Sequence, residues 1–274
     1  MSRLIALRQR IKTATTIQKT THAMRLTSMS AHARLQRKKQ FLRGYKQSLE
    51  DLMHRLGLEE KIEKNAASKK RLVIVVGSQK GLCGAFNSRL LHLYEQQSSS
   101  ADFQKEHVVC IGRKIIEYFE QHATMPRHSY PTFSANNFVA IAHELERIIF
   151  GEHGYDTIVV YCNYPHTFFL QKSTVNTIIR RTLTEAQNTS VKDPYSYEES
   201  PYEFHAKLQR MYFKACLEEL LFNSLIAEQA SRFIAMDMAT RNAETILTDM
   251  QRDYNKLRQA SITRELTDLA GSIL

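Results

Sequence analysis

The sequence has no long apolar run and no clustered cysteines. None of its stretches approaches the roughly 18 apolar residues that a membrane-spanning helix needs. The N-terminus is rich in arginine and has no apolar core of a signal peptide. We therefore expect the chain to be cytosolic, or peripheral to a membrane. The four cysteines lie far apart, without a CxxC pair or a histidine at ligand spacing, so neither a zinc site nor a disulfide framework is indicated.

Glycine and proline are missing from both ends of the chain. Residues 1–43 contain neither, and the same holds for residues 202–270. All five prolines and most of the nine glycines lie in the central part. Because these two residues disfavour helix interiors most strongly, the distribution predicts three domains. They are an N-terminal coiled-coil helix over residues 1–60, a central α/β domain over 70–200 and a C-terminal coiled-coil helix over 202–274.

Acidic residues are absent from the first 49 positions, which hold twelve lysines and arginines. Since the whole chain carries a formal charge of +10, the remainder carries −2. A charge run is usually a solvated helix face, but a stretch without acids forfeits every i,i+4 ion pair and repels itself. A polyanionic partner, either nucleic acid or an acidic protein surface, would offset that cost.

The basic residues should surround the N-terminal helix. At about 100° per residue, Arg8, Lys12 and Lys19 share one side of it. The opposite side carries Arg3, Arg10 and Lys46. This distribution suits a partner that encloses the helix better than one groove of a nucleic-acid duplex.

Apolar residues recur at alternating steps of three and four in both arms, which is the period of a coiled-coil seam. In the first arm the pattern occurs at Leu4, Leu7, Ile11 and Ala14, weakens to Thr21, Met24, Ser28 and Ala31, and resumes at Leu42, Tyr45, Leu49, Leu52 and Leu56. In the second arm it occurs at Leu247, Met250, Tyr254, Leu257 and Ser261. Helices of these lengths would extend about 80 and 100 Å, so we expect an antiparallel pair in which each seam buries the other.

The centre of the chain alternates strand and helix patterns. Strands are predicted at 71–76, 107–111, 157–161 and 175–181, and helices at 86–97, 114–122 and 138–150. Such alternation implies a layered α/β domain with a largely parallel sheet. The predicted fold class is therefore α/β, with a long antiparallel coiled coil of the N- and C-terminal helices plus a central Rossmann-like α/β domain.

The turn from Gly77 to Gly84 follows a predicted strand and precedes a predicted helix, a context in which backbone N–H groups can bind phosphate. Its glycine spacing matches neither GxGxxG nor GxxxxGK[ST], so a tight turn is favoured over a nucleotide site. The histidines are dispersed, and no serine or cysteine lies in a nucleophile elbow. We expect no catalytic residue, cofactor or metal in this chain.

Four segments resemble the gamma subunit of bacterial F-type ATP synthases. They are residues 7–24 (LRQRIKTATTIQKTTHAM), 80–87 (KGLCGAFN), 227–242 (AEQASRFIAMDMATRN) and 254–268 (YNKLRQASITRELTD). The resemblance extends over the whole chain and is weakest from about residue 98 to 200. It implies that the terminal helices form an antiparallel coiled coil inside a hexamer of alpha and beta subunits, with the central domain near the membrane-embedded c-ring.

The resemblance implies a mechanical function. Ion flow would turn the c-ring and this chain with it, and the asymmetric shaft would push each catalytic beta subunit through its conformations. Nucleotide chemistry would stay in beta, so the chain itself would be non-catalytic. The implied partners are the alpha, beta and epsilon subunits and the c-ring. Nucleic acid is not among them, and the chain would associate with the cytoplasmic face of a bacterial inner membrane only through the c-ring.

The resemblance also implies contact residues. Those expected to face the alpha/beta hexamer are Arg8, Lys12, Lys19, Met24, Arg258, Gln259 and Thr263. Those expected on the side of the c-ring and epsilon are Arg43, Tyr45, Tyr197 and Glu198. The chain departs from the family pattern at several positions, including His22 where a lysine is usual, which leaves open whether it serves a housekeeping or a divergent second ATP synthase.

Two other classes of function stay open. A basic coiled-coil protein that binds nucleic acid is one, although the first 40 residues hold no aromatic side chain that could stack on bases. A small nucleotide-dependent α/β enzyme is the other. It would require ligand binding between Gly77 and Gly84.

Overall fold

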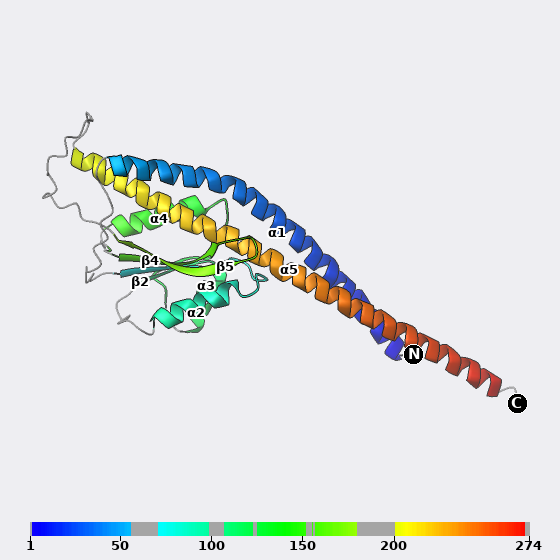
Figure 1. Cartoon of the computed structure of the whole chain (residues 1–274). Coiled ribbons are helices and arrows are strands. Elements are labelled where there is room, and N and C mark those ends of the chain that lie inside the picture. Colours follow the sequence, from blue (N-terminus) through cyan, green and yellow to red (C-terminus); the bar gives the residue numbers. More distant parts are fainter. Residues whose placement is uncertain are drawn as a thin grey trace. The chain divides into compact units, whose positions relative to one another are not determined.

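The described part of the chain forms five helices and five strands. In the computed structural model these residues are 2–55, 71–98, 107–122, 125–151, 155, 157–179 and 201–271. In chain order the elements are α1 (Ser2–Arg55), β1 (Arg71–Val76), α2 (Phe86–Ser98), β2 (His107–Ile111), α3 (Arg113–Gln121), β3 (His128–Tyr130), α4 (Phe138–Phe150), β4 (Thr157–Pro165), β5 (Gln171–Ile179) and α5 (Pro201–Gly271) (Figure 1). Within these residues, no helix has both the length and the apolar character that crossing a bilayer requires.

The chain divides into two compact units. The helix-pair unit comprises residues 1–30 and 232–274, and the α/β unit comprises residues 31–231. Helices α1 and α5 contribute to both units. With 54 residues in α1 and 71 in α5, they account for the two ends that lack helix breakers. Helix α5 covers its breaker-free stretch together with the proline and the glycine that bound it.

The α/β unit contains a five-stranded sheet in the order β3–β2–β1–β4–β5. All neighbours pair in parallel except β4 and β5, which form an antiparallel hairpin. The predicted α/β fold with a largely parallel sheet is therefore confirmed. Strand β5 begins four residues before its predicted start, because the hairpin pairing continues as far as Pro165 opposite Gln171. Strand β3 was not predicted, since three residues are too few to show an alternating pattern.

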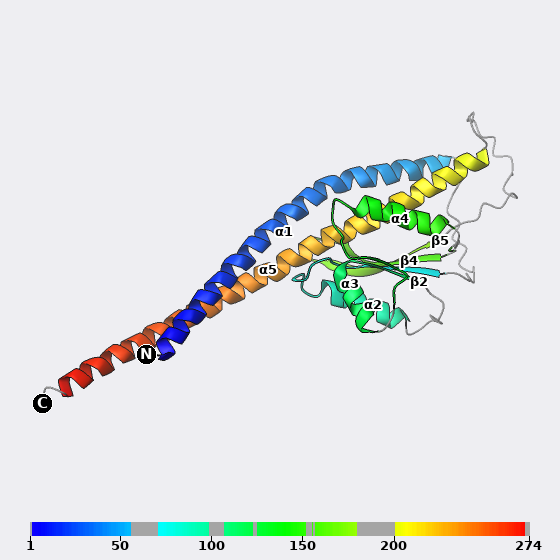
Figure 2. The same cartoon turned by 180° about the vertical axis from the view of Figure 1, so that it is seen from behind.

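Both faces of the sheet are covered. Leu72, Ile74 and Val76 of β1 lie in a core that also contains residues of α1, α4 and α5. Val73 and Val75 lie in a second core, with residues of α2 and α3. Figures 1 and 2 show the same layers, with α4 and α5 on one side of the sheet and α2 and α3 on the other. Burial on both faces explains why β1 is apolar at successive positions.

Helices α1 and α5 also pack against each other within the α/β unit. Leu49 of α1 is buried beside Leu208 of α5. The nearby ammonium of Lys46 lies 2.9 Å from a carboxylate oxygen of Glu219 and 3.4 Å from one of Glu50. Burial opposes the charge of Lys46, but the contacts with these carboxylates outweigh it and raise the pKa of Lys46 to about 12. The seam therefore accommodates a charged lysine by pairing it.

The predicted seam is wrong at Tyr45. Its side chain is 46% exposed, and the half-buried position is Lys46. A step of four from Leu42 to Lys46, followed by a step of three to Leu49, preserves the coiled-coil period. A search for apolar residues could not find this position, because its burial depends on the carboxylate of Glu219 across the seam.

The turn after β1 is closed by its own hydrogen bonds and by close backbone approach. The Asn87 side chain accepts a hydrogen bond from the Ser78 backbone N–H at 3.0 Å and donates one to the Ser78 hydroxyl at 2.8 Å. A Cβ added to Gly77 would lie 2.2 Å from the Ile115 side chain. Gly112, which precedes α3, has a φ of +95°. This is the geometry of a tight turn in which the two glycines permit β1 and α3 to approach.

Replacing Gly112 with alanine should destabilise the α/β unit by roughly 2 kcal/mol, because a strained φ costs about that much. The new Cβ would also lie 2.6 Å from the Gly77 carbonyl oxygen. Urea unfolding of the full chain, followed by circular dichroism, measures the change. The control is Gly44→Ala in α1, where a Cβ would meet nothing within 4 Å and should stabilise the helix by about 0.5–1 kcal/mol. Equal effects of the two variants would contradict the close-approach explanation.

Candidate partner-contact surfaces

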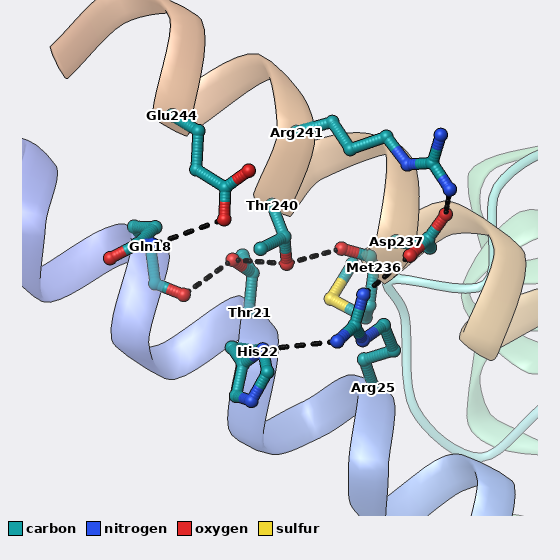
Figure 3. Close-up of polar contacts among 9 residues, drawn as sticks. All are labelled: Gln18, Thr21, His22, Arg25, Met236, Asp237, Thr240, Arg241 and Glu244. Atoms are coloured by element: carbon teal, nitrogen blue, oxygen red, sulfur yellow. Dashed lines mark hydrogen bonds and ion pairs between the residues drawn. The ribbon is translucent and has the colours of Figure 1, made fainter. Parts of the chain in front are cut away.

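Polar side chains join α1 to α5 in the helix-pair unit (Figure 3). The Gln18 side-chain amide donates a hydrogen bond to the Glu244 carboxylate at 3.2 Å, and the hydroxyls of Thr21 and Thr240 lie 3.0 Å apart. Residue numbers thus rise along α1 while those of the contacted residues fall along α5. The helices are antiparallel, as the sequence predicts.

Arg25 forms an ion pair across the same seam. Its guanidinium lies 2.6 Å from the Asp237 carboxylate, and Arg241 of α5 contacts that carboxylate at 3.0 Å (Figure 3). The other terminal nitrogen of Arg25 lies 3.2 Å from Nδ1 of His22. The hydrogen bond from Arg25, helped by the charge of Arg241, lowers the pKa of Asp237. Asp237 is therefore ionised at neutral pH and fixes Arg25 against α5.

The seam between the helices is narrow and partly polar. Ser28 and Thr240 are only 3% and 2% exposed, and Met236, four residues before Thr240 on α5, is buried as well. Along α1, half-buried positions recur at steps of three and four from Leu4 through Thr21. Small side chains allow close contact between the helix backbones, whereas larger apolar side chains such as Ile5, Leu26 and Met238 are exposed outside the seam.

Exposed threonines on both helices direct their hydroxyls back to their own backbone. Each hydroxyl donates a hydrogen bond to the carbonyl four residues earlier, and this holds for Thr13, Thr16, Thr20, Thr245 and Thr248. Such hydroxyls are satisfied locally. What these side chains offer to a neighbour is chiefly their methyl groups.

The cations predicted to face a partner are exposed. Arg8, Lys12 and Lys19 all project from α1 into solvent. Across the residues that the structure describes, none of the three forms an ion pair with an acidic side chain. No direct ion pair among the described residues relieves their mutual repulsion, as the acid-free first 49 residues indicate.

The predicted contact residues near the end of α5 are exposed too. Arg258, Gln259 and Thr263 are solvent-accessible. The Thr263 hydroxyl donates a hydrogen bond to the Gln259 carbonyl at 3.0 Å, so its donor is used within the helix. Met24 of α1 is half-buried and offers only part of its side chain to a partner.

An apolar groove between the two helices was not predicted from the sequence. It has a volume of about 380 Å³ and is lined by Gln9, Arg10, Thr13, Ala14, Ile17, Ala243, Ile246 and Met250. Ile17 and Ile246 are about half exposed. Both isoleucines fall outside the three-and-four step of the seam, and this displacement is the sequence signal that could have identified them.

A second set of predicted contacts belongs to the α/β unit. Arg43 and Tyr45 lie on one turn of α1 and are exposed. Tyr197 and Glu198 lie outside the described residues. Because they are two residues apart on one helix, their side chains point to nearly opposite sides of α1, so the structure does not bring these two residues onto one face.

The described residues contain no cluster of three histidine, cysteine or acidic side chains that could hold a metal ion. Burial raises the pKa of Cys110 to about 12 and that of Cys162 to about 11. These two thiols stay protonated at neutral pH and cannot act as nucleophiles there. The candidate functional features of the described residues are therefore exposed charged side chains on two long helices, which are suited to contacts with another protein.

Comparison with known proteins relates the chain to ATP synthases over nearly its whole length. A family model described as ATP synthase matches residues 3–273. The ATP synthase gamma chain of Clostridium pasteurianum is 30% identical over 279 residues, covering 98% of this chain and 96% of the relative. That of Chlorobium phaeobacteroides strain BS1 is 28% identical over 288 residues, covering 99% and 97%.

The chain belongs to the ATP synthase gamma-chain family. Solved structures agree in fold. A chain from the Euglena gracilis mitochondrial ATP synthase, in its OSCP/F1/c-ring structure, matches with a TM-score of 0.69 at 14% identity, covering 99% of this chain and 94% of that one. A chain from the central stalk and c-ring of the Tetrahymena thermophila enzyme matches with a TM-score of 0.61 at 20% identity, covering 80% and 99%.

Gamma-chain membership settles the functional class that the sequence predicts. A gamma chain is the central-stalk subunit of an ATP synthase and does not itself catalyse ATP synthesis. The predicted central-shaft function and the predicted non-catalytic role are therefore both confirmed. The relatives named above are all ATP synthase gamma chains, so the alternative of a basic nucleic-acid-binding coiled coil finds no support.

The Arg25–Asp237 pair should make the stability of this gamma chain sensitive to acid. Because folding lowers the pKa of Asp237 below its usual value of about 3.9, the ionised carboxylate contributes stability above about pH 4. That contribution is lost as the pH falls through the folded pKa. Asp237→Asn should therefore lower the thermal midpoint at neutral pH and reduce the further loss on acidification.

Thermal melts of the full chain, monitored by circular dichroism at a series of pH values, test this. The matched control is Asp249→Asn, because Asp249 lies on the same helix and its one ion pair among the described residues is with Arg252 of that helix, at 3.8 Å. The control should melt like the unmodified chain. If Asp237→Asn also melts like the unmodified chain at every pH, the ion pair does not hold the two helices together.

Proposed function

We propose that this gamma chain is the rotating shaft that couples ion-driven rotation of a c-ring to conformational change in a catalytic hexamer of alpha and beta subunits. The proposal places it at the cytoplasmic face of a bacterial inner membrane, attached through the c-ring and in contact with an epsilon subunit. The observation that carries it is the helix-pair unit itself. Its seam is filled by small and polar residues, while unpaired cations project outward from α1.

The physical mechanism is a shift of populations. A catalytic subunit that exchanges between conformations is biased only by a contact that differs in free energy between them. The two helices differ in charge around their common axis, because the first 49 residues carry cations and no acidic side chain. Rotation would bring these faces to each catalytic subunit in turn and shift its equilibrium.

Electrostatic attraction would hold the shaft in the hexamer. Arg8, Lys12 and Lys19 share one side of α1 and have no acidic partner among the described residues. An acidic surface on the beta subunits would compensate their charge. Met24, half-buried on the same helix, would add a small apolar contact.

The end of α5 would form a second contact with the hexamer. Arg258 and Gln259 are exposed on consecutive positions, and their long side chains can donate hydrogen bonds to loop carbonyls or carboxylates. Thr263, whose hydroxyl donates within the helix, would still accept a hydrogen bond through the same oxygen. These directional contacts would transmit force between the shaft and the hexamer.

The contacts with the c-ring and epsilon would lie in the α/β part of the chain. Arg43 and Tyr45 are exposed on α1 and would supply a cation and an aromatic ring on different sides of the same helical turn. Tyr197 and Glu198 complete the set that we assign to this side. A lasting attachment is required here, because the ring must turn the shaft without slipping.

Replacing Arg258 and Gln259 together with alanine should reduce coupled ATP synthesis at least tenfold while leaving the fold intact. Both side chains are exposed, so their loss costs little stability, whereas the lost hydrogen bonds would weaken force transmission. ATP synthesis in vesicles reconstituted with the complete complex measures the effect. The control is Arg252→Ala, an exposed cation that lies nearby on α5. Unchanged synthesis by the double variant would remove the two residues from the contact.

Reversing the charge of Arg8, Lys12 and Lys19 to glutamate should lower the yield of assembled complex roughly tenfold or more, because like charges would face each other in the interface. Native gels and subunit mass determination measure assembly. A matched triple reversal at Arg89, Arg113 and Arg147, which are exposed in the α/β unit, should assemble more normally. Equal yields from the two triple variants would refute attraction between α1 and an acidic hexamer.

A further inference from the structure

His22 holds the second terminal nitrogen of the Arg25 guanidinium. One terminal nitrogen lies 2.6 Å from the Asp237 carboxylate, and the other lies 3.2 Å from Nδ1 of His22 (Figure 3). A guanidinium has hydrogen-bond donors only, so Nδ1 must be the acceptor and the proton of the neutral ring lies on Nε2. A protonated histidine has donors at both ring nitrogens. The contact is therefore available only to a neutral His22.

The charged side chains around His22 come from both helices of the unit. They are Lys19 and Arg25 of α1, and Asp237, Arg241 and Glu244 of α5. Both carboxylates are already engaged, Asp237 by the two arginines and Glu244 by the Gln18 amide. Among the described residues, no carboxylate lies within ion-pair distance of His22 itself. A proton on the ring would therefore add a fourth positive charge to this network without a carboxylate to pair it.

Solvent reaches one end of the network and not the other. His22 is exposed, whereas the side chains of Arg25 and Asp237 are only 26% and 19% exposed. Histidine is the side chain that ordinarily changes charge between pH 5 and 8. A change of pH in that range would thus act on an exposed ring that is hydrogen-bonded to an ion pair in the seam.

We propose that His22 is an acid-operated switch of the helix-pair unit. The neutral ring positions Arg25 on Asp237. The protonated ring loses the hydrogen bond and repels the guanidinium, which loosens the contact between α1 and α5. His22 acts through Arg25 and is in this sense a positioning residue.

The switch would also change what the shaft presents to a partner. Protonation adds a positive charge to an exposed position of α1 and leaves the charge of Arg25 less well paired. An acidic surface that faces this helix would then attract it more strongly. This step rests on the proposed function, in which the shaft turns within an acidic hexamer, and its consequence is slower rotation in acid.

The pH range separates this switch from the titration of Asp237. The carboxylate contributes stability that is lost only below about pH 4. Because only the neutral ring accepts the hydrogen bond from Arg25, the contribution of His22 is present at pH 8 and lost as the pH falls toward 5. The two contributions can therefore be measured in one chain at different pH values.

Two substitutions at position 22 imitate the two states of the switch. His22→Gln keeps an acceptor oxygen and is uncharged at every pH, while His22→Lys is charged and has no acceptor. Thermal melts of the full chain, followed by circular dichroism, should separate these variants by about 3 °C. We expect the unmodified chain to melt like the glutamine variant at pH 8 and like the lysine variant at pH 5. An unmodified chain that melts like the glutamine variant at both pH values would refute the switch.

Removal of Arg25 should abolish the effect of His22. In an Arg25→Gln background, His22 and His22→Gln should give the same dependence of the thermal midpoint on pH, because no guanidinium remains to be positioned. A difference that persists in this background would show that position 22 acts without Arg25 and would refute the proposal. The control is His143→Gln, because His143 is an exposed histidine of α4, and it should melt like the unmodified chain at both pH values.

ATP hydrolysis by the complete complex tests the consequence for rotation. The rate of the unmodified complex, divided by that of the His22→Gln complex, should be close to 1 at pH 8 and fall at least twofold by pH 5.5. The same ratio for His143→Gln should stay near 1. A ratio for His22→Gln that does not change with pH would refute the action on rotation but leave the proposed function intact. Failure of the unmodified complex to couple ATP synthesis to rotation at pH 8 would instead refute the proposed function.

Discussion

The antiparallel pairing of α1 with α5 is the constraint on which the other features of the molecule depend. The same two helices form the seam of the helix-pair unit and one layer over the sheet of the α/β unit. Their register is set by side chains that contact across the seam, such as Arg25 with Asp237 and Lys46 with Glu219. Each contact joins residues far apart in sequence, so the pairing is a tertiary interaction and not a property of either helix alone.

Electrostatics divides the surface of α1 into inner and outer parts. The basic residues that point toward α5, namely Arg25 and Lys46, meet carboxylates, while those that point outward meet none in the described residues. Only a minority of the α1 cations therefore stabilise the fold through ion pairs. The other α1 cations repel one another, and this repulsion is small enough for the chain to fold. A surrounding acidic partner would attract these cations. The seam could be thin because binding, rather than the isolated chain, completes the burial of these helices.

Much of the fold could be predicted from the sequence, because its signals are local. Missing glycine and proline marked both long helices, and a run such as RLVIVV marked a strand buried on two faces. The sequence analysis failed where a feature depends on an interaction with residues far away in the sequence. Lys46 belongs to the seam because Glu219 lies opposite, and β3 exists because it pairs with β2. The predicted contact cations are exposed, but the groove beside Ile17 depends on how two helices meet, which no single helical pattern records.

The threonines of the helix-pair unit have a consequence for movement. Residues such as Thr16 and Thr248 return their hydroxyl hydrogens to their own helix, so they keep polar atoms near the surface without needing a bond from outside. A neighbour moving past meets methyl groups and need not break a directional bond at each step. The repeated use of threonine, rather than serine or leucine, thus makes these helices fit for sliding.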